Sequence, residues 1–210
     1  MAFCRWILLF ALFTGIGVTV SAVAANAGKP LNKHEVAWHH FADQILSLHR
    51  KLISQVPVVK KTRVGGYARQ PAFYREVSYY SARTHKLISR IRWEKQHPDK
   101  LHTIEVFIRD DQGRVTRDFT AAYLPNYYRA PSQTLISFHG YHDGLHAFRT
   151  FDADGYRVVE GCRGEYQGKK VEIILDEDEI AEGAPAMHSA IYKTCFRGMR
   201  RKAGKYLTPQ

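Results

Sequence analysis

The sequence contains none of the short motifs that identify a catalytic or cofactor chemistry by themselves. It has no Gly-x-Ser-x-Gly nucleophile elbow and no glycine-rich phosphate loop. It also has no Cys-x-x-Cys-His haem-attachment pattern, no zinc-finger spacing and no His-Glu-x-x-His pair. An enzyme is therefore the less favoured interpretation, and would depend on carboxylates or serines that folding brings together.

Long apolar runs are missing outside the first 27 residues. Arg5 precedes an apolar run over residues 6–20, and residues 21–27 offer small-residue cleavage patterns. We predict a signal peptide over residues 1–27, with an uncleaved membrane anchor as the alternative. The mature protein is then expected to be soluble and either periplasmic or secreted.

Cysteine is scarce, with three in 210 residues. Cys4 falls within the predicted signal peptide, which leaves Cys162 and Cys195 in the mature chain. Two cysteines in an exported protein most simply form one disulfide. A metal-binding pair or two free thiols are the alternatives.

The residues after the signal peptide begin with an amphipathic helix. Asn32 is a candidate N-cap with Glu35 three positions on, and Pro57 ends the pattern. Apolar side chains recur at steps of three and four: Trp38, Phe41, Ile45, Leu48 and Leu52. Residues 28–57 are therefore predicted as a linker and a helix that packs on the rest of one globular unit.

The remaining chain, residues 58–210, is predicted to be β-rich. Residues 58–70 resemble a basic connector, after which short alternating segments are separated by Gly, Asp and Pro turns. Four turns end in glycine, at positions 113, 144, 155 and 168. The pattern favours about eight antiparallel strands in a meander sheet or half-open barrel.

The C-terminal part changes character again. Four consecutive acidic residues, 176–179, end the strand pattern. Residues 184–199 are expected to form a short helix that carries Cys195, followed by a basic tail. The predicted fold class is thus α+β, with a helix at each end of the sheet.

Three histidines and an aspartate gather around one predicted turn: His139, His142, Asp143 and His146. Imidazole and carboxylate groups that converge at a turn can bind zinc or copper. Counted from a turn centred between His142 and Asp143, His139 and His146 are equidistant and should form a cross-strand pair. The alternative is a polar turn flanked by histidines that face solvent.

The chain has an excess of positive charge, with 31 Lys and Arg against 20 Asp and Glu and a formal net charge of +11. Arg90 and Arg92 share one face of a predicted strand, and a tyrosine-rich loop carries Tyr127, Tyr128 and Arg129. We predict these residues as a surface for an anionic ligand. A basic surface that only confers solubility is the alternative.

These observations predict an exported binding or accessory protein that recognises an anionic ligand or a protein partner in the cell envelope. Export argues against nucleic acid as the main ligand. The second hypothesis is a metal-binding protein or a metal-dependent hydrolase at the histidine turn.

Overall fold

The computed structural model describes residues 30–125, 129–204 and 208–209. The predicted signal peptide, together with Tyr127 and Tyr128, lies outside the described residues. The chain separates into two compact units, residues 1–30 and residues 31–210, and the fold below is that of the second. Within the described part, no helix is long and apolar enough to span a membrane.

The second unit contains one antiparallel sheet and a small number of helical segments. The strands are β1 (Val58–Tyr67), β2 (Gln70–Ser81), β3 (Leu87–Glu94), β4 (Leu101–Arg109), β5 (Val115–Ala122), β6 (Gln133–His142), β7 (Leu145–Asp152), β8 (Arg157–Tyr166) and β9 (Lys169–Asp176). The helices are α1 (Lys33–Ser54), α2 (Glu177–Glu182) and α3 (Ala190–Cys195), with a 3₁₀ turn η1 (Pro185–His188) before α3.

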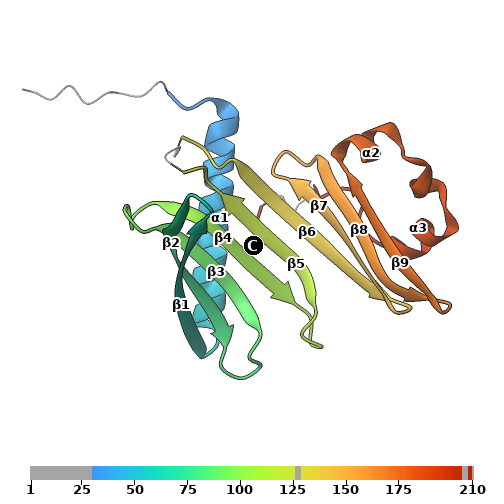
Figure 1. Cartoon of the computed structure of the whole chain (residues 1–210), viewed down its shortest axis with the longest axis horizontal. Helices are drawn as coiled ribbons and strands as arrows, with labels where there is room; N and C mark the ends of the chain where they lie inside the picture. Colours follow the sequence, from blue (N-terminus) through green and yellow to red (C-terminus); the bar gives the residue numbers. More distant parts are fainter. Residues whose placement is uncertain (1–29, 126–128, 205–207, 210) are drawn as a thin grey trace, which may run out of the picture. The chain divides into compact units, whose positions relative to one another are not determined.

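The nine strands lie in the sheet in the same order as in the sequence, so that each pairs with its chain neighbours (Figure 1). The sheet is open, with β1 and β9 at its edges. The meander is confirmed, with one strand more than predicted. The additional strand is β1, which sequence analysis assigned to a basic connector; it pairs with β2 along almost its whole length.

Asp-Gly and Gln-Gly pairs form two of the two-residue turns of the sheet. Asp143 and Gly144 have φ angles of 52° and 77°, and Gln167 and Gly168 have 52° and 71°. Positive φ at both central residues is typical of the two-residue hairpin turn whose twist matches that of the strands. Each of these pairs therefore fixes the register of its hairpin.

The two Asp-x-x-Gly turns form a second, longer type. The Asp110 carboxylate accepts hydrogen bonds from the backbone N–H groups of Gln112 and Arg114. Asp152 does the same for Asp154 and Tyr156. The carboxylates thus satisfy backbone donors at the turn, which explains why aspartate begins both segments.

Helix α1 begins as predicted and covers the middle of the sheet. Asn32 and Glu35 form a reciprocal capping box. Phe41, Ile45 and Leu48 are buried against apolar side chains of β3–β7, among them Ile104, Val106, Phe119, Ile136 and Phe151. Helix α1 therefore depends on the sheet for its stability, as expected for an amphipathic helix.

The C-terminal segment covers the other end of the sheet, next to β7, β8 and β9 (Figure 1). The predicted single helix over residues 184–199 is wrong in detail, because Ser189 is extended and separates η1 from α3, which it caps. The four acidic residues also have another role: Asp176 is the N-cap of α2, and the three that follow lie in its first turn, where negative charge is favourable.

A disulfide and a buried ion pair hold the C-terminal segment on the sheet. Cys162 of β8 and Cys195 of α3 form the predicted disulfide, with Cα atoms 6.0 Å apart. Beside it, the fully buried Glu160 accepts hydrogen bonds from Arg149, at 2.7 Å, and from the Tyr192 hydroxyl. Arg149 also donates to the carbonyl oxygens of Met199 and Arg200, at 3.2 and 3.0 Å.

Both covers lie on the same face of the sheet. Along β7, alternate residues point to one face. Leu145 and Ala147 pack with the C-terminal segment, and Phe151 packs with α1. No helix in the described ranges packs on the opposite face, which we call the uncovered face.

Removal of the disulfide is expected to weaken the whole unit. A Cys162→Ser, Cys195→Ser variant should lose about 3–4 kcal/mol of unfolding free energy, because the crosslink closes a loop of 33 residues in the unfolded chain. Urea unfolding of both proteins, with and without reductant, measures this loss. A wild-type protein that reductant does not affect would contradict the expectation.

Candidate functional site

Strands β6 and β7 form a hairpin that carries His139, His142 and His146, which we call the histidine hairpin. Its side chains lie on both faces of the sheet. The turn is centred between Asp143 and Gly144, so His146 lies opposite Tyr141 and His139 lies opposite Phe148. The predicted direct pairing of His139 with His146 is therefore wrong: the turn centre lies one residue later, so the partner of His139 is two residues beyond His146. The two rings nevertheless meet diagonally on the uncovered face, with His139 Nδ1 and His146 Nε2 2.9 Å apart.

The other two residues of the predicted metal site turn away from this pair. His142 Nε2 donates a hydrogen bond to the Thr194 carbonyl oxygen near the end of α3. Asp143 pairs with Arg197 at 2.8 Å. No group of three or more His, Cys, Asp or Glu side chains that could hold a metal ion is found in the described part of the chain. The structure thus does not bring His139, His142, Asp143 and His146 together as a zinc or copper site.

His139 and His146 instead belong to a chain of side chains that runs across three strands. Asp118 of β5 lies 2.6 Å from His139 Nε2. The His139 and His146 rings are nearly parallel, with centroids 5.2 Å apart, and the Tyr141 ring stacks on His146 at 4.6 Å. The Arg114 guanidinium lies 5.0 Å from the centre of the Tyr141 ring. The chain therefore holds the His146 ring between two neighbours and restricts its rotation.

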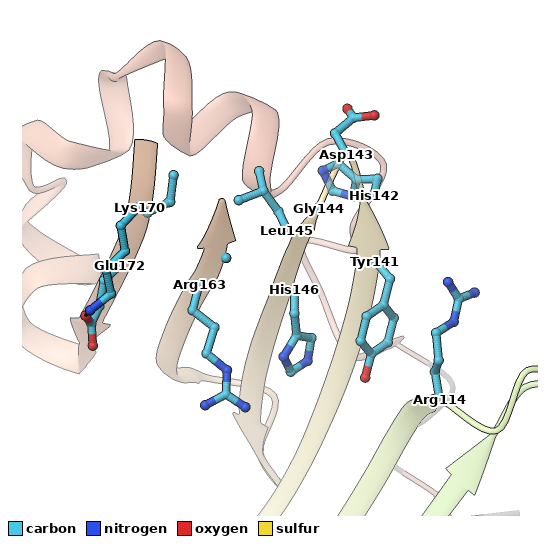
Figure 2. Close-up of a pocket in the computed structure, with 12 residues that line it drawn as sticks. Arg114, Tyr141, His142, Asp143, Gly144, Leu145, His146, Arg163, Lys170 and Glu172 are labelled. Carbon is cyan, nitrogen blue, oxygen red and sulfur yellow. Dashed lines mark hydrogen bonds and ion pairs between the residues drawn. The ribbon is translucent and has the colours of Figure 1, made fainter. Parts of the chain in front are cut away.

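Tyr141 and His146 also begin a row of paired residues across β6–β9. Tyr141 pairs with His146, His146 with Arg163, and Arg163 with Glu172. Directly paired residues of an antiparallel sheet point to the same face. Figure 2 shows the Tyr141, His146 and Arg163 side chains extending from neighbouring strands in one direction, with the Arg114 side chain beside Tyr141.

This row lines an open pocket of about 830 Å³ at the end of the sheet that carries the hairpin turns. Two of the carboxylates in its lining are already paired with cations: Asp143 with Arg197, and Glu172 with Lys170 at 2.8 Å. Arg114 is paired with Asp110 at its edge. Among the described residues, none forms a hydrogen bond or ion pair with the Arg163 guanidinium, and Arg163 is exposed. The pocket therefore contains a cation that Glu172 of β9 influences electrostatically but does not contact as an ion pair.

The electrostatics of the pocket depend on partial burial and on this cation. Burial lowers the pKa of His146 below its ordinary value, and the nearby His139 and Arg163 lower it further. Burial raises the pKa of the Tyr141 hydroxyl, although Arg109, Arg114 and Arg163 oppose the shift. Around neutral pH, His146 is therefore neutral and Tyr141 retains its proton.

An apolar strip lies next to the pocket on the same face. Gly161 has no side chain, and a Cβ atom there would lie 2.3 Å from the Phe148 ring. The ring therefore lies across β8 only because position 161 is glycine. Ile174 of β9 follows it and is 58% exposed.

The predicted basic surface has a different character from the one expected. Arg90 and Arg92 do share the uncovered face, but both surround Glu76 of β2, which is only 3% exposed. Glu76 accepts hydrogen bonds from Arg63 at 2.6 Å and from Arg92 at 2.8 Å, and Arg90 lies 3.7 Å away. Arg90 also binds Glu105 at 3.1 Å. These arginines are therefore already paired with carboxylates.

Arg129 is paired as well. Its guanidinium donates two hydrogen bonds to the Glu35 carboxylate, at 2.5 and 3.0 Å. Because Glu35 also caps α1, this contact joins the loop after β5 to the start of the helix. Tyr127 and Tyr128, which were predicted to bind with Arg129, lie outside the described residues.

Sequence analysis did not identify the residues that complete the pocket. Arg114 and Arg163 line the pocket, and Asp118 contacts His139. All three are distant from the histidine turn in sequence, and strand pairing brings Asp118 and Arg163 to it. The one available signal was the Asp143-Gly144 pair, which would have centred the hairpin correctly and placed His146 opposite Tyr141.

Comparison of the chain with protein-family models, with curated proteins and with solved structures found no significant match. The functional argument therefore depends on the geometry of the chain alone.

Glu76 generates a prediction about acid stability. Burial would raise its pKa, but hydrogen bonds from Arg63 and Arg92 outweigh burial and lower it to about 2, from an ordinary value of 4.5. Its ionised form therefore stabilises the fold above about pH 4.5, and this contribution is lost as the pH falls through about 2. By linkage it is worth up to about 3 kcal/mol.

A Glu76→Gln variant should be less stable at neutral pH by about 3 kcal/mol, because it leaves a cluster of arginines without its central carboxylate. It should also lose the part of the acid sensitivity between pH 4.5 and 2 that Glu76 contributes. Urea unfolding at several pH values measures both effects. Glu105→Gln, which removes a more exposed carboxylate on the same face, is the control and should cost about 1 kcal/mol. Equal losses in the two variants would contradict this account.

Proposed function

We propose that this protein is an exported binding or accessory protein that takes an anionic ligand in the pocket on the uncovered face of its sheet. Arg163, Tyr141 and His146 are the binding residues, and Arg114 lies at the rim. An arginine side chain offers several N–H donors in a planar arrangement that suits carboxylate or phosphate oxygens.

The observation that carries the proposal is the difference between the two groups of arginines on this face. The arginines around Glu76 have carboxylate partners within hydrogen-bonding distance. Arg163 has none among the described residues, although Glu172 follows it in the same row. Glu172 instead pairs with Lys170, so a ligand anion would be the first direct counterion of Arg163.

Export is supported by two independent features. The first 27 residues have the composition of a signal peptide. The Cys162–Cys195 disulfide is also typical of proteins in oxidising compartments outside the cytoplasm. Ligands in the cell envelope that carry phosphate or carboxylate groups are then the expected partners, and nucleic acid is not.

Titration with sodium phosphate at constant ionic strength tests the proposal. Amide chemical shifts of β6–β8 should change saturably in the mature protein. The Arg163→Gln variant should bind at least about tenfold more weakly, because it loses a charge-assisted hydrogen bond.

Arg201→Gln is the matched control, since it removes the same charge from the exposed C-terminal tail. It should bind phosphate like the wild type. An equal loss in both variants would mean that only net charge matters, and shift changes confined to other surfaces would exclude this pocket.

A further inference from the structure

The two hydrogen bonds that join Asp118, His139 and His146 must run in one direction. The reason is that an ionised carboxylate only accepts, and a neutral imidazole has one donor and one acceptor nitrogen. An ionised carboxylate is a pure acceptor, so the hydrogen bond of 2.6 Å to Asp118 requires a proton on His139 Nε2. Asp118 and His139 are largely shielded, with 18% and 14% of their side chains exposed. This contact therefore determines the tautomer of a neutral His139.

The same reasoning extends to His146. A neutral His139 with its proton on Nε2 has only a lone pair at Nδ1. The 2.9 Å contact between His139 Nδ1 and His146 Nε2 then requires a proton on His146 Nε2. A neutral His146 with that proton has a lone pair at Nδ1. No hydrogen-bond partner for His146 Nδ1 is found in the described part of the chain, and His146 lines the pocket.

From this geometry we infer that the pocket selects an anion that carries its own hydroxyl group. This inference rests on the proposed function and defines its ligand class. Arg163 binds the charge, and His146 Nδ1 accepts a hydrogen bond from the hydroxyl of the same ligand. Hydrogen phosphate and 2-hydroxy carboxylates have this combination of groups.

An anion without a proton is disfavoured at this position. Sulfate presents only acceptor oxygens, so one of them would face the lone pair of His146 Nδ1 without a hydrogen between them. Hydrogen phosphate has nearly the same size and shape but retains a proton. The charged and titratable groups around His146 are His139, Tyr141 and Arg163, with Asp118 beyond His139 and Arg114 beyond Tyr141. Of these, Asp118 is the group that fixes the direction.

The tautomers can be measured directly. At about pH 8, above the ordinary histidine pKa of about 6.5, a long-range ¹H–¹⁵N correlation spectrum of the imidazole rings distinguishes a proton on Nδ1 from one on Nε2. His139 and His146 should both carry it on Nε2. A proton on His146 Nδ1, or on both nitrogens of His139, would overturn the inference.

The ligand class is tested with matched pairs of anions in the same buffer. Phosphate should bind about tenfold more tightly than sulfate, which corresponds to one hydrogen bond. Lactate should likewise bind more tightly than propionate if the hydroxyl of a carboxylic acid can serve. A preference for phosphate alone would restrict the class to hydrogen phosphate.

An Asp118→Asn variant tests whether the carboxylate sets this preference. The Asn side chain can donate as well as accept, so both directions of the chain become possible. The ratio of the phosphate affinity to the sulfate affinity should then fall toward one. Asp111→Asn, which changes an exposed carboxylate of the β4–β5 turn, is the control and should keep the preference.

The outcomes separate this inference from the proposed function. Equal binding of phosphate and sulfate that still depends on Arg163 would retain the anion site and overturn the hydroxyl requirement. Absence of binding by any of these anions would overturn both. A preference that survives in Asp118→Asn would show that Asp118 has only a structural role.

Discussion

Burial of a single face of the sheet is the constraint on which the rest of the structure depends. Helix α1 covers the middle strands, and the C-terminal segment covers β7–β9 on the same side. The apolar residues of each strand must therefore point toward these covers. The alternate residues point to the uncovered face, where polar side chains can satisfy one another across the strands.

The covered face has a fully buried carboxylate on β8 that requires complete pairing. Glu160 is fully buried and has hydrogen bonds from Arg149, Arg157 and Tyr192. A buried carboxylate without such partners would cost several kcal/mol. The same cluster binds carbonyl oxygens after α3 through Arg149, so the ion pair and the disulfide both attach the C-terminal segment to β7 and β8.

The uncovered face is divided into two regions with different roles. Around Glu76, the cations have carboxylate partners, and the cluster contributes to stability, more so above pH 4.5. Around His146, the polar side chains form a directed chain that ends in a pocket, and the arginine of that pocket, Arg163, has no carboxylate within ion-pair distance among the described residues. The arginines of the first region are paired with carboxylates, whereas Arg163 in the second has no contact ion pair among the described residues.

Local patterns in the sequence predicted the elements more successfully than their contacts. Alternation of apolar residues predicted most strands, the Asn32 and Glu35 spacing predicted the start of α1, and the two remaining cysteines predicted the disulfide. Strand β1 was missed because its lysines, arginine and paired glycines resemble a connector. The register of the histidine hairpin was wrong because the turn residues were counted as four rather than two.

The candidate site could not be assembled from sequence for a physical reason. Arg163 and Asp118 approach the histidines through the pairing of β5–β8, and one step of register changes which side chains share a face. Likewise, Arg90 and Arg92 were correctly placed on one face, but the carboxylates that pair with them lie on neighbouring strands. Charge alone therefore identified arginines that were already paired.

The most direct test of the anion site is a crystal structure of the mature protein grown in sodium phosphate. The account predicts an ordered phosphate within hydrogen-bonding distance of the Arg163 guanidinium and His146 Nδ1. Phosphate bound only at other basic surfaces, with this pocket occupied by solvent or by Glu172 paired to Arg163, would contradict it.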